Sequence, residues 1–89
     1  MIFYPGATYY STKSLILNNN GLGSYVRPHT LLTLESEHTH FETGMKMYTF
    51  TNEGGYSITI NEGSKILKTF KLSFLDDFDN TNIETFDIK

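Results

Sequence analysis

The chain has 89 residues, no cysteine, no tryptophan and a net charge of −3. A chain of this length forms one domain with little interior for an enclosed active site. Without cysteine it has neither disulfides nor thiolate metal ligands, which fits a reducing compartment. No apolar stretch reaches the length of a membrane helix, and the N-terminus lacks the pattern of a signal peptide. We therefore expect one small cytoplasmic domain over residues 1–89 with no membrane contact.

The first half of the chain contains two predicted strands separated by an irregular connection. Residues 11–17 (STKSLIL) are rich in strand-forming residues and are followed by an Asn- and Gly-rich turn signal. Residues 18–29 then form the longest irregular connection expected in the chain. Residues 30–38 (TLLTLESEH) predict a second strand, with Leu32 and Leu34 on one face.

The second half contains a repeated turn. The tripeptide Asn-Glu-Gly occurs at residues 52–54 and again at 61–63, and a glycine in the third place supplies the positive φ that closes a tight turn. Alternating apolar and polar residues predict strands at 45–51 and 56–61. A third strand is expected over 65–78. The two turns thus predict a central three-stranded meander over about 45–75.

The segment 65–78 also has a helical interpretation, because several of its apolar side chains fall on one helical face. Its Thr, Ser and Phe content favours a strand, with a bulge at Leu67, where the alternation breaks. With five to seven short strands and no helical pattern strong enough for a βαβ unit, the chain predicts an all-β fold, a small antiparallel barrel or sandwich.

The segment ESEHTHFE, residues 35–42, is a candidate metal site. If the strand continues without a bulge, His38, His40 and Glu42 point to the same side as Leu32 and Leu34, and two imidazoles with a carboxylate can bind zinc. The pattern is short and common by chance, so we favour the interpretation that it is the polar end of a strand. A metal-dependent enzyme is the second alternative function. Under the favoured interpretation we expect no cofactor.

A second candidate is a nucleic-acid-binding face. Small barrels bind single strands by stacking bases on aromatic rings in a basic groove. Only seven residues in the chain are Lys or Arg and the net charge is negative, which is unfavourable for binding phosphates. The candidate residues of this alternative are Lys65, Lys68, Lys71, Tyr9, Tyr10 and Tyr25.

The third candidate is the acidic C-terminal segment, residues 76–89, which holds five acidic residues and one lysine. Large apolar side chains recur among the acids, so we expect the segment to dock as a strand or as an interaction arm. An acidic, aromatic surface suits a basic cleft on a partner, such as a nucleic-acid-binding enzyme. The predicted partner-binding residues are Asp76, Asp77, Phe78, Asp79, Glu84 and Phe86.

No catalytic motif is present: the sequence has no Gly-rich phosphate loop, no Gly-x-Ser-x-Gly elbow and no Cys nucleophile. We therefore expect a non-enzymatic protein-binding module or inhibitor. Its composition is compatible with a phage or mobile-element accessory protein that acts on a host enzyme. Open strand edges would also allow the chain to form a homo-oligomer.

Overall fold

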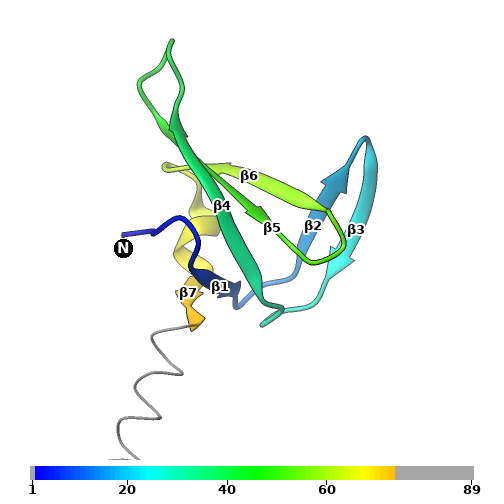
Figure 1. Ribbon diagram of the computed structural model, residues 1–89. Coiled ribbons are helices and arrows are strands. Elements are labelled where there is room, and N and C mark those ends of the chain that lie inside the picture. The colour runs from blue at the N-terminus through cyan, green and yellow to red at the C-terminus, as the bar shows by residue number, and fades with distance from the viewer. Residues whose placement is uncertain (1, 74–89) are drawn as a thin grey trace, which may run out of the picture.

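The computed structural model describes residues 2–73, which form one seven-stranded antiparallel sheet curled into a half-barrel (Figure 1). The predicted all-β antiparallel fold is confirmed. The order of strands across the sheet is β3-β2-β6-β5-β4-β1-β7. The strands are β1 (Thr8–Ser11), β2 (Leu15–Asn19), β3 (Leu22–Val26), β4 (Leu32–Thr39), β5 (Lys46–Thr51), β6 (Ser57–Asn61) and β7 (Phe70–Leu72), and a short 3-10 helix, η1 (Lys65–Thr69), precedes β7.

The core lies on the concave side of the sheet and is rich in aromatic rings. Phe50 is fully buried, with its ring centroid 4.5 Å from that of Phe70 and 5.8 Å from that of Tyr9. Phe3, from the segment before β1, packs 5.2 Å from Tyr9. The Tyr9 hydroxyl accepts a hydrogen bond of 2.6 Å from the Tyr4 amide. The segment before β1 is therefore held against the core by both a ring contact and a hydrogen bond.

Both predicted Asn-Glu-Gly turns are present, but their glycines act differently from expectation. The side-chain oxygen of Asn52 accepts a hydrogen bond of 2.9 Å from the Gly54 amide, and Asn61 does the same for Gly63 at 3.0 Å. The positive φ of the first turn, 85°, belongs to Gly55, and neither Gly54 nor Gly63 has a positive φ. The asparagine side chains thus stabilise these turns by accepting backbone hydrogen bonds.

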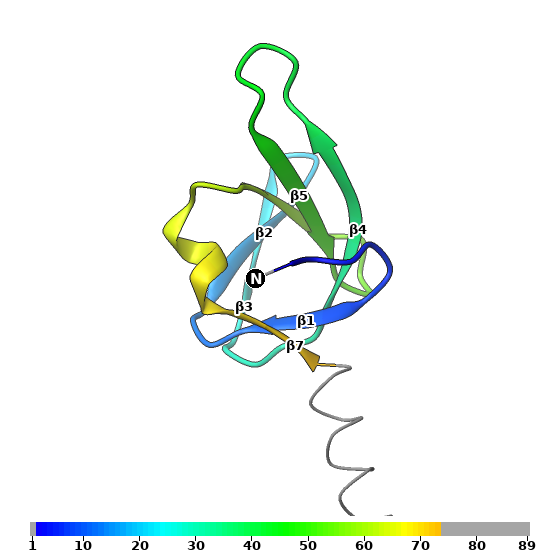
Figure 2. The same cartoon turned by 90° about the vertical axis from the view of Figure 1, so that its left-hand side faces the viewer.

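A three-stranded meander exists, but it consists of β4, β5 and β6. The segment after β6 does not return alongside it, because the Ser64 hydroxyl accepts a hydrogen bond from the Ile66 amide and caps η1. Leu67, where we expected a bulge, is buried within η1. The strand interpretation of 65–78 is therefore wrong for 65–69 and correct for 70–72, and residues 74–78 lie outside the described part of the chain. Figure 2 shows β7 beside β1. In the register of this antiparallel pair, Tyr9 lies opposite Leu72.

Residues 18–29 were expected to be irregular; this expectation is wrong for 18–26 and correct for 27–29, which belong to no strand. Leu22–Val26 forms β3, which pairs along its whole length with β2. The two strands are joined at Asn20 and Gly21, whose φ values of 52° and 89° are those of a type I′ hairpin turn. The predicted strand 11–17 is divided between β1 and β2. The Asn-Gly dipeptide thus marks a two-residue hairpin.

Candidate partner-binding surfaces

The predicted acidic binding residues lie outside the described part of the chain, which ends at residue 73. They are Asp76, Asp77, Phe78, Asp79, Glu84 and Phe86. The structure therefore leaves the acidic interaction arm as a prediction. The surfaces described below all belong to residues 2–73.

The predicted nucleic-acid-binding set is only partly exposed. Tyr9 is completely buried, so its proposed role in base stacking is wrong. Tyr10 is half-buried, with its ring 5.2 Å from that of His29. Tyr25 is 63% exposed on β3, at one edge of the sheet. The three lysines, Lys65, Lys68 and Lys71, are exposed on η1 and on β7, the strand at the opposite edge.

A β-bulge in β4 turns the His38 side chain away from the core-facing side of the strand. The pairing of β4 with β5 shifts between Leu34 and Ser36, so Glu35 is an extra residue. Beyond the bulge His38 lies opposite Met47, which alternates with the buried Tyr48. His38 therefore points to the outer face. The expectation that it shares a face with Leu34 is wrong, because one inserted residue exchanges the two faces of a strand.

The other two residues of the candidate metal site lie beyond the end of β4. His40 receives a hydrogen bond of 3.3 Å at its Nδ1 from the Glu42 amide, and its ring stacks on Phe41 at 5.7 Å and 3°. Within residues 2–73 no three His, Asp or Glu side chains are grouped as a metal site would require. His40 thus takes part in local turn structure, whereas His38 belongs to β4.

The turn between β4 and β5, which we call the hairpin tip (residues 40–45), extends beyond the half-barrel (Figure 1). Backbone hydrogen bonds of 2.8 Å join the His40 amide to the Met45 carbonyl and the Gly44 amide to the His40 carbonyl. Phe41 is 91% exposed on this ordered turn. The sequence did contain a signal for it, a large apolar residue between His40 and Glu42 in an otherwise polar segment.

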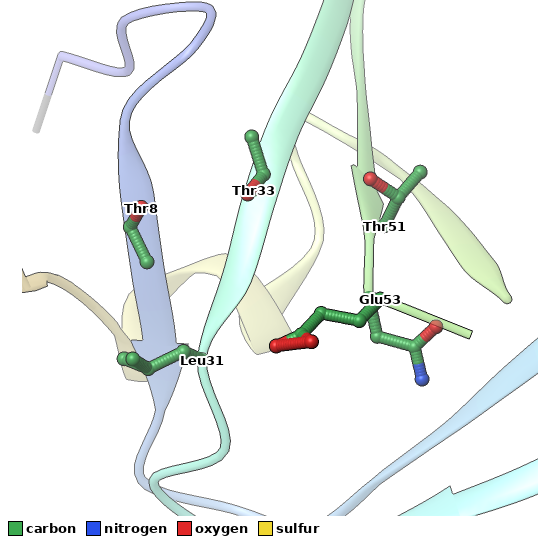
Figure 3. A pocket seen from close by; sticks show the side chains of 6 residues that line it. Thr8, Leu31, Thr33, Thr51 and Glu53 are labelled. Atoms are coloured by element: carbon green, nitrogen blue, oxygen red, sulfur yellow. The ribbon is translucent and has the colours of Figure 1, made fainter. Parts of the chain in front are cut away.

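Two hollows lie elsewhere on the surface. The first, which we call the polar hollow, has a volume of about 270 Å³ on the outer face of β1, β4 and β5. It is lined by Thr8, Leu31, Thr33, Thr51, Asn52 and Glu53 (Figure 3). The second has a volume of about 430 Å³, and its lining includes the buried Phe3, Tyr48 and Leu67 together with the charged Glu62 and Lys68. Neither hollow contains any residue that the sequence had suggested as a site, except Lys68.

No model of a known protein family matches this chain. No curated protein and no solved structure matches it either. Among the described residues, no helix is long and apolar enough to cross a membrane. The function of the protein has to be inferred from the chemistry of its own surfaces.

Proposed function

We propose that this protein is a non-enzymatic protein-binding module that anchors to its partner through the hairpin tip. The observation that carries the proposal is the 91% exposure of Phe41. Moving a phenylalanine side chain from water into an apolar pocket contributes roughly 1.5–3 kcal/mol. The Phe41 ring gains no such free energy while it is exposed to water, but it would gain it in a matching apolar pocket of a partner.

The backbone of the hairpin tip supports this role. Gly44 adopts a φ of 74°, and the Met45 amide donates a hydrogen bond of 3.2 Å to the Thr43 hydroxyl. The stacking of Phe41 on His40 further restricts the ring. A segment that is already ordered loses less conformational entropy on binding, so more of the contact energy remains as affinity. Aromatic anchors of this kind dominate the energetics of many interfaces.

The partner class proposed from the sequence is a protein with a basic surface, such as a nucleic-acid-binding enzyme. The acidic residues between 76 and 89 would accelerate its association through charge, while Phe41 would supply short-range affinity. The nucleic-acid-binding alternative has less support, because Tyr9 is buried and Tyr10 is half-buried with its ring beside that of His29.

The test compares three tagged proteins, the wild type, Phe41→Ala and Leu22→Ala, in affinity capture from lysate with and without nuclease treatment. Leu22 is the matched control, since it is an apolar residue, 66% exposed, on the β2–β3 hairpin. The captured partner is then purified and its Kd measured for each variant. Phe41→Ala should weaken binding about 30-fold, equivalent to about 2 kcal/mol for an interface anchor, and Leu22→Ala should leave the Kd unchanged.

Equal affinity of the wild type and Phe41→Ala for the purified partner would contradict the proposed role of the hairpin tip. Capture that disappears with nuclease treatment would instead support the lysine face of the alternative function, since the retained molecules would be held through nucleic acid.

A further inference from the structure

Three threonines form a row across the outer face of the sheet. Thr8 on β1 lies opposite Thr33 on β4, and Thr33 lies opposite Thr51 on β5. Each follows or precedes a buried residue in its strand, so all three side chains point outward. Directly opposite residues on paired strands have Cβ atoms about 4.5–5.5 Å apart. The row therefore places three hydroxyl groups side by side along one wall of the polar hollow (Figure 3).

Within residues 2–73 these hydroxyl groups have no hydrogen-bond partner. No described residue forms a hydrogen bond with the side chain of Thr8, Thr33 or Thr51, and the one ion pair among the described residues joins Lys46 to Glu37. The carboxylate of Glu53 is likewise without a hydrogen-bond or ion-pair partner among them. The polar hollow thus presents hydrogen-bonding groups that no residue within 2–73 satisfies.

Glu53 supplies the one charge in the lining of the polar hollow. Figure 3 shows its side chain extending into the hollow on the side where Leu31 lies. The turn that carries Glu53 is held by Asn52, whose side-chain oxygen accepts hydrogen bonds of 2.9 Å from the Gly54 amide and 3.0 Å from the Tyr56 amide. The carboxylate is therefore attached to an ordered backbone.

The residues that line the polar hollow indicate which chemical class of ligand it could bind. A carboxylate accepts hydrogen bonds and favours a cation, and threonine hydroxyls can accept as well. Leu31, 55% exposed, offers an apolar wall for methylene groups. The hollow, with a volume of about 270 Å³, has room for one long side chain. Among residues 2–73, no aromatic ring lines the hollow to stack against a sugar.

We propose that the polar hollow binds an arginine side chain of the partner protein. The guanidinium group has five N–H donors and no acceptor, which matches the Glu53 carboxylate and the row of hydroxyls, and its methylene stem fits against Leu31. A lysine offers three donors without the planar fork that pairs with a carboxylate. The inference rests on the proposed function for the source of the arginine, but it uses a different surface from the hairpin tip.

The test needs no natural partner. The full-length protein, labelled with ¹⁵N, is titrated with the peptide acetyl-Gly-Gly-Arg-Gly-Gly-amide while amide chemical shifts are followed. Saturable shifts should occur at Thr33, Thr51 and Glu53. Replacing arginine in the peptide by citrulline, which keeps the shape and removes the charge, should abolish them. Glu53→Gln should raise the peptide Kd at least tenfold, whereas the control Glu62→Gln, in the second hollow, should leave it unchanged.

Shifts of equal size with the citrulline peptide, or an unchanged Kd in Glu53→Gln, would overturn the proposal. A parallel titration with spermidine distinguishes the other source of cationic nitrogen, and tighter binding of spermidine at the same amides would replace the arginine assignment. Because only the peptide is present, the result is independent of Phe41. Absence of arginine-peptide binding would not contradict the proposal for the hairpin tip. Likewise, an unchanged Kd of Phe41→Ala for the partner would not contradict the proposal for the polar hollow.

Discussion

Two phenylalanines on one hairpin have opposite environments. Phe50, on β5, is completely buried and contacts the aromatic core, whereas Phe41, in the hairpin tip, is 91% exposed. The change occurs along β4, where burial alternates as far as Leu34 and every residue after it is exposed. The bulge at Glu35 marks this boundary. The pairing of β4 with β5 therefore continues beyond the last core-facing residue of β4. The hairpin before the bulge stabilises the fold, and the hairpin tip is available for contacts with other molecules.

The largest expected effect is at the buried end. Phe50→Ala removes a ring that packs on three others, and such a substitution costs about 3–5 kcal/mol of unfolding free energy. The measurement is urea denaturation followed by circular dichroism. If the variant does not fold, Phe50→Leu, which keeps much of the volume, should remain folded and lose less stability. A loss of unfolding free energy below about 1 kcal/mol for Phe50→Ala would show that Phe50 and Phe41 differ less in their contribution to stability than their burial suggests.

An intermediate effect is expected at Tyr9, whose hydroxyl joins the core to the segment before β1. Tyr9→Phe keeps the ring and removes the acceptor of the Tyr4 amide, which should cost about 1 kcal/mol of unfolding free energy. Tyr25→Phe is the matched control, because Tyr25 is 63% exposed, and its cost should be near zero. Equal denaturation midpoints for the two variants would argue against this hydrogen bond.

The pKa of Tyr9 should also affect how the free energy of unfolding depends on pH. Burial raises the pKa of its hydroxyl above the ordinary value near 10. Below that value the hydroxyl is protonated in both states and has no effect on the pH dependence. Above it the unfolded state loses the proton first, so the unfolding free energy falls as pH rises through the folded pKa. Denaturation measured between pH 9 and 11 should show a smaller fall in Tyr9→Phe than in the wild type.

The smallest expected effect is at the exposed end. Phe41→Ala removes a side chain that contributes little to the core, so its unfolding free energy should remain within about 0.5 kcal/mol of the wild type. The same urea experiment measures it, with Phe50→Ala as the contrasting variant. A loss of more than about 1 kcal/mol would mean that Phe41 stabilises the fold, which would weaken the interpretation of the hairpin tip as a binding anchor.

Local signals in the sequence predicted local structure well. The two Asn-Glu-Gly turns are present where expected, and Leu32 and Leu34, which their spacing placed on one face of a strand, are both buried. These features depend on residues within one strand or turn. The alternation has a period of two regardless of which strands pair, so it can be read without knowing the topology.

Features that depend on how separate segments pair or pack could not be read in this way. The bulge at Glu35 arises from the pairing of β4 with β5, and it reversed the expected face of His38. The burial of Tyr9 depends on contacts with Phe3 and Phe50, which no pattern near Tyr9 reveals. One local signal was missed: Ser64 directly before Lys-Ile-Leu is a typical helix N-cap, and it marks the start of η1.

The position of β1 has a consequence for the order in which the sheet assembles. The pairs β2–β3, β4–β5 and β5–β6 join strands that follow one another along the chain, whereas both neighbours of β1, β4 and β7, lie far from it in sequence. Closing such long loops costs chain entropy before the contacts repay it, and distant pairings slow folding. During synthesis β1 emerges before either of its neighbours. We therefore expect the three hairpins to form first, with the sheet completed only after residues 70–72 have left the ribosome.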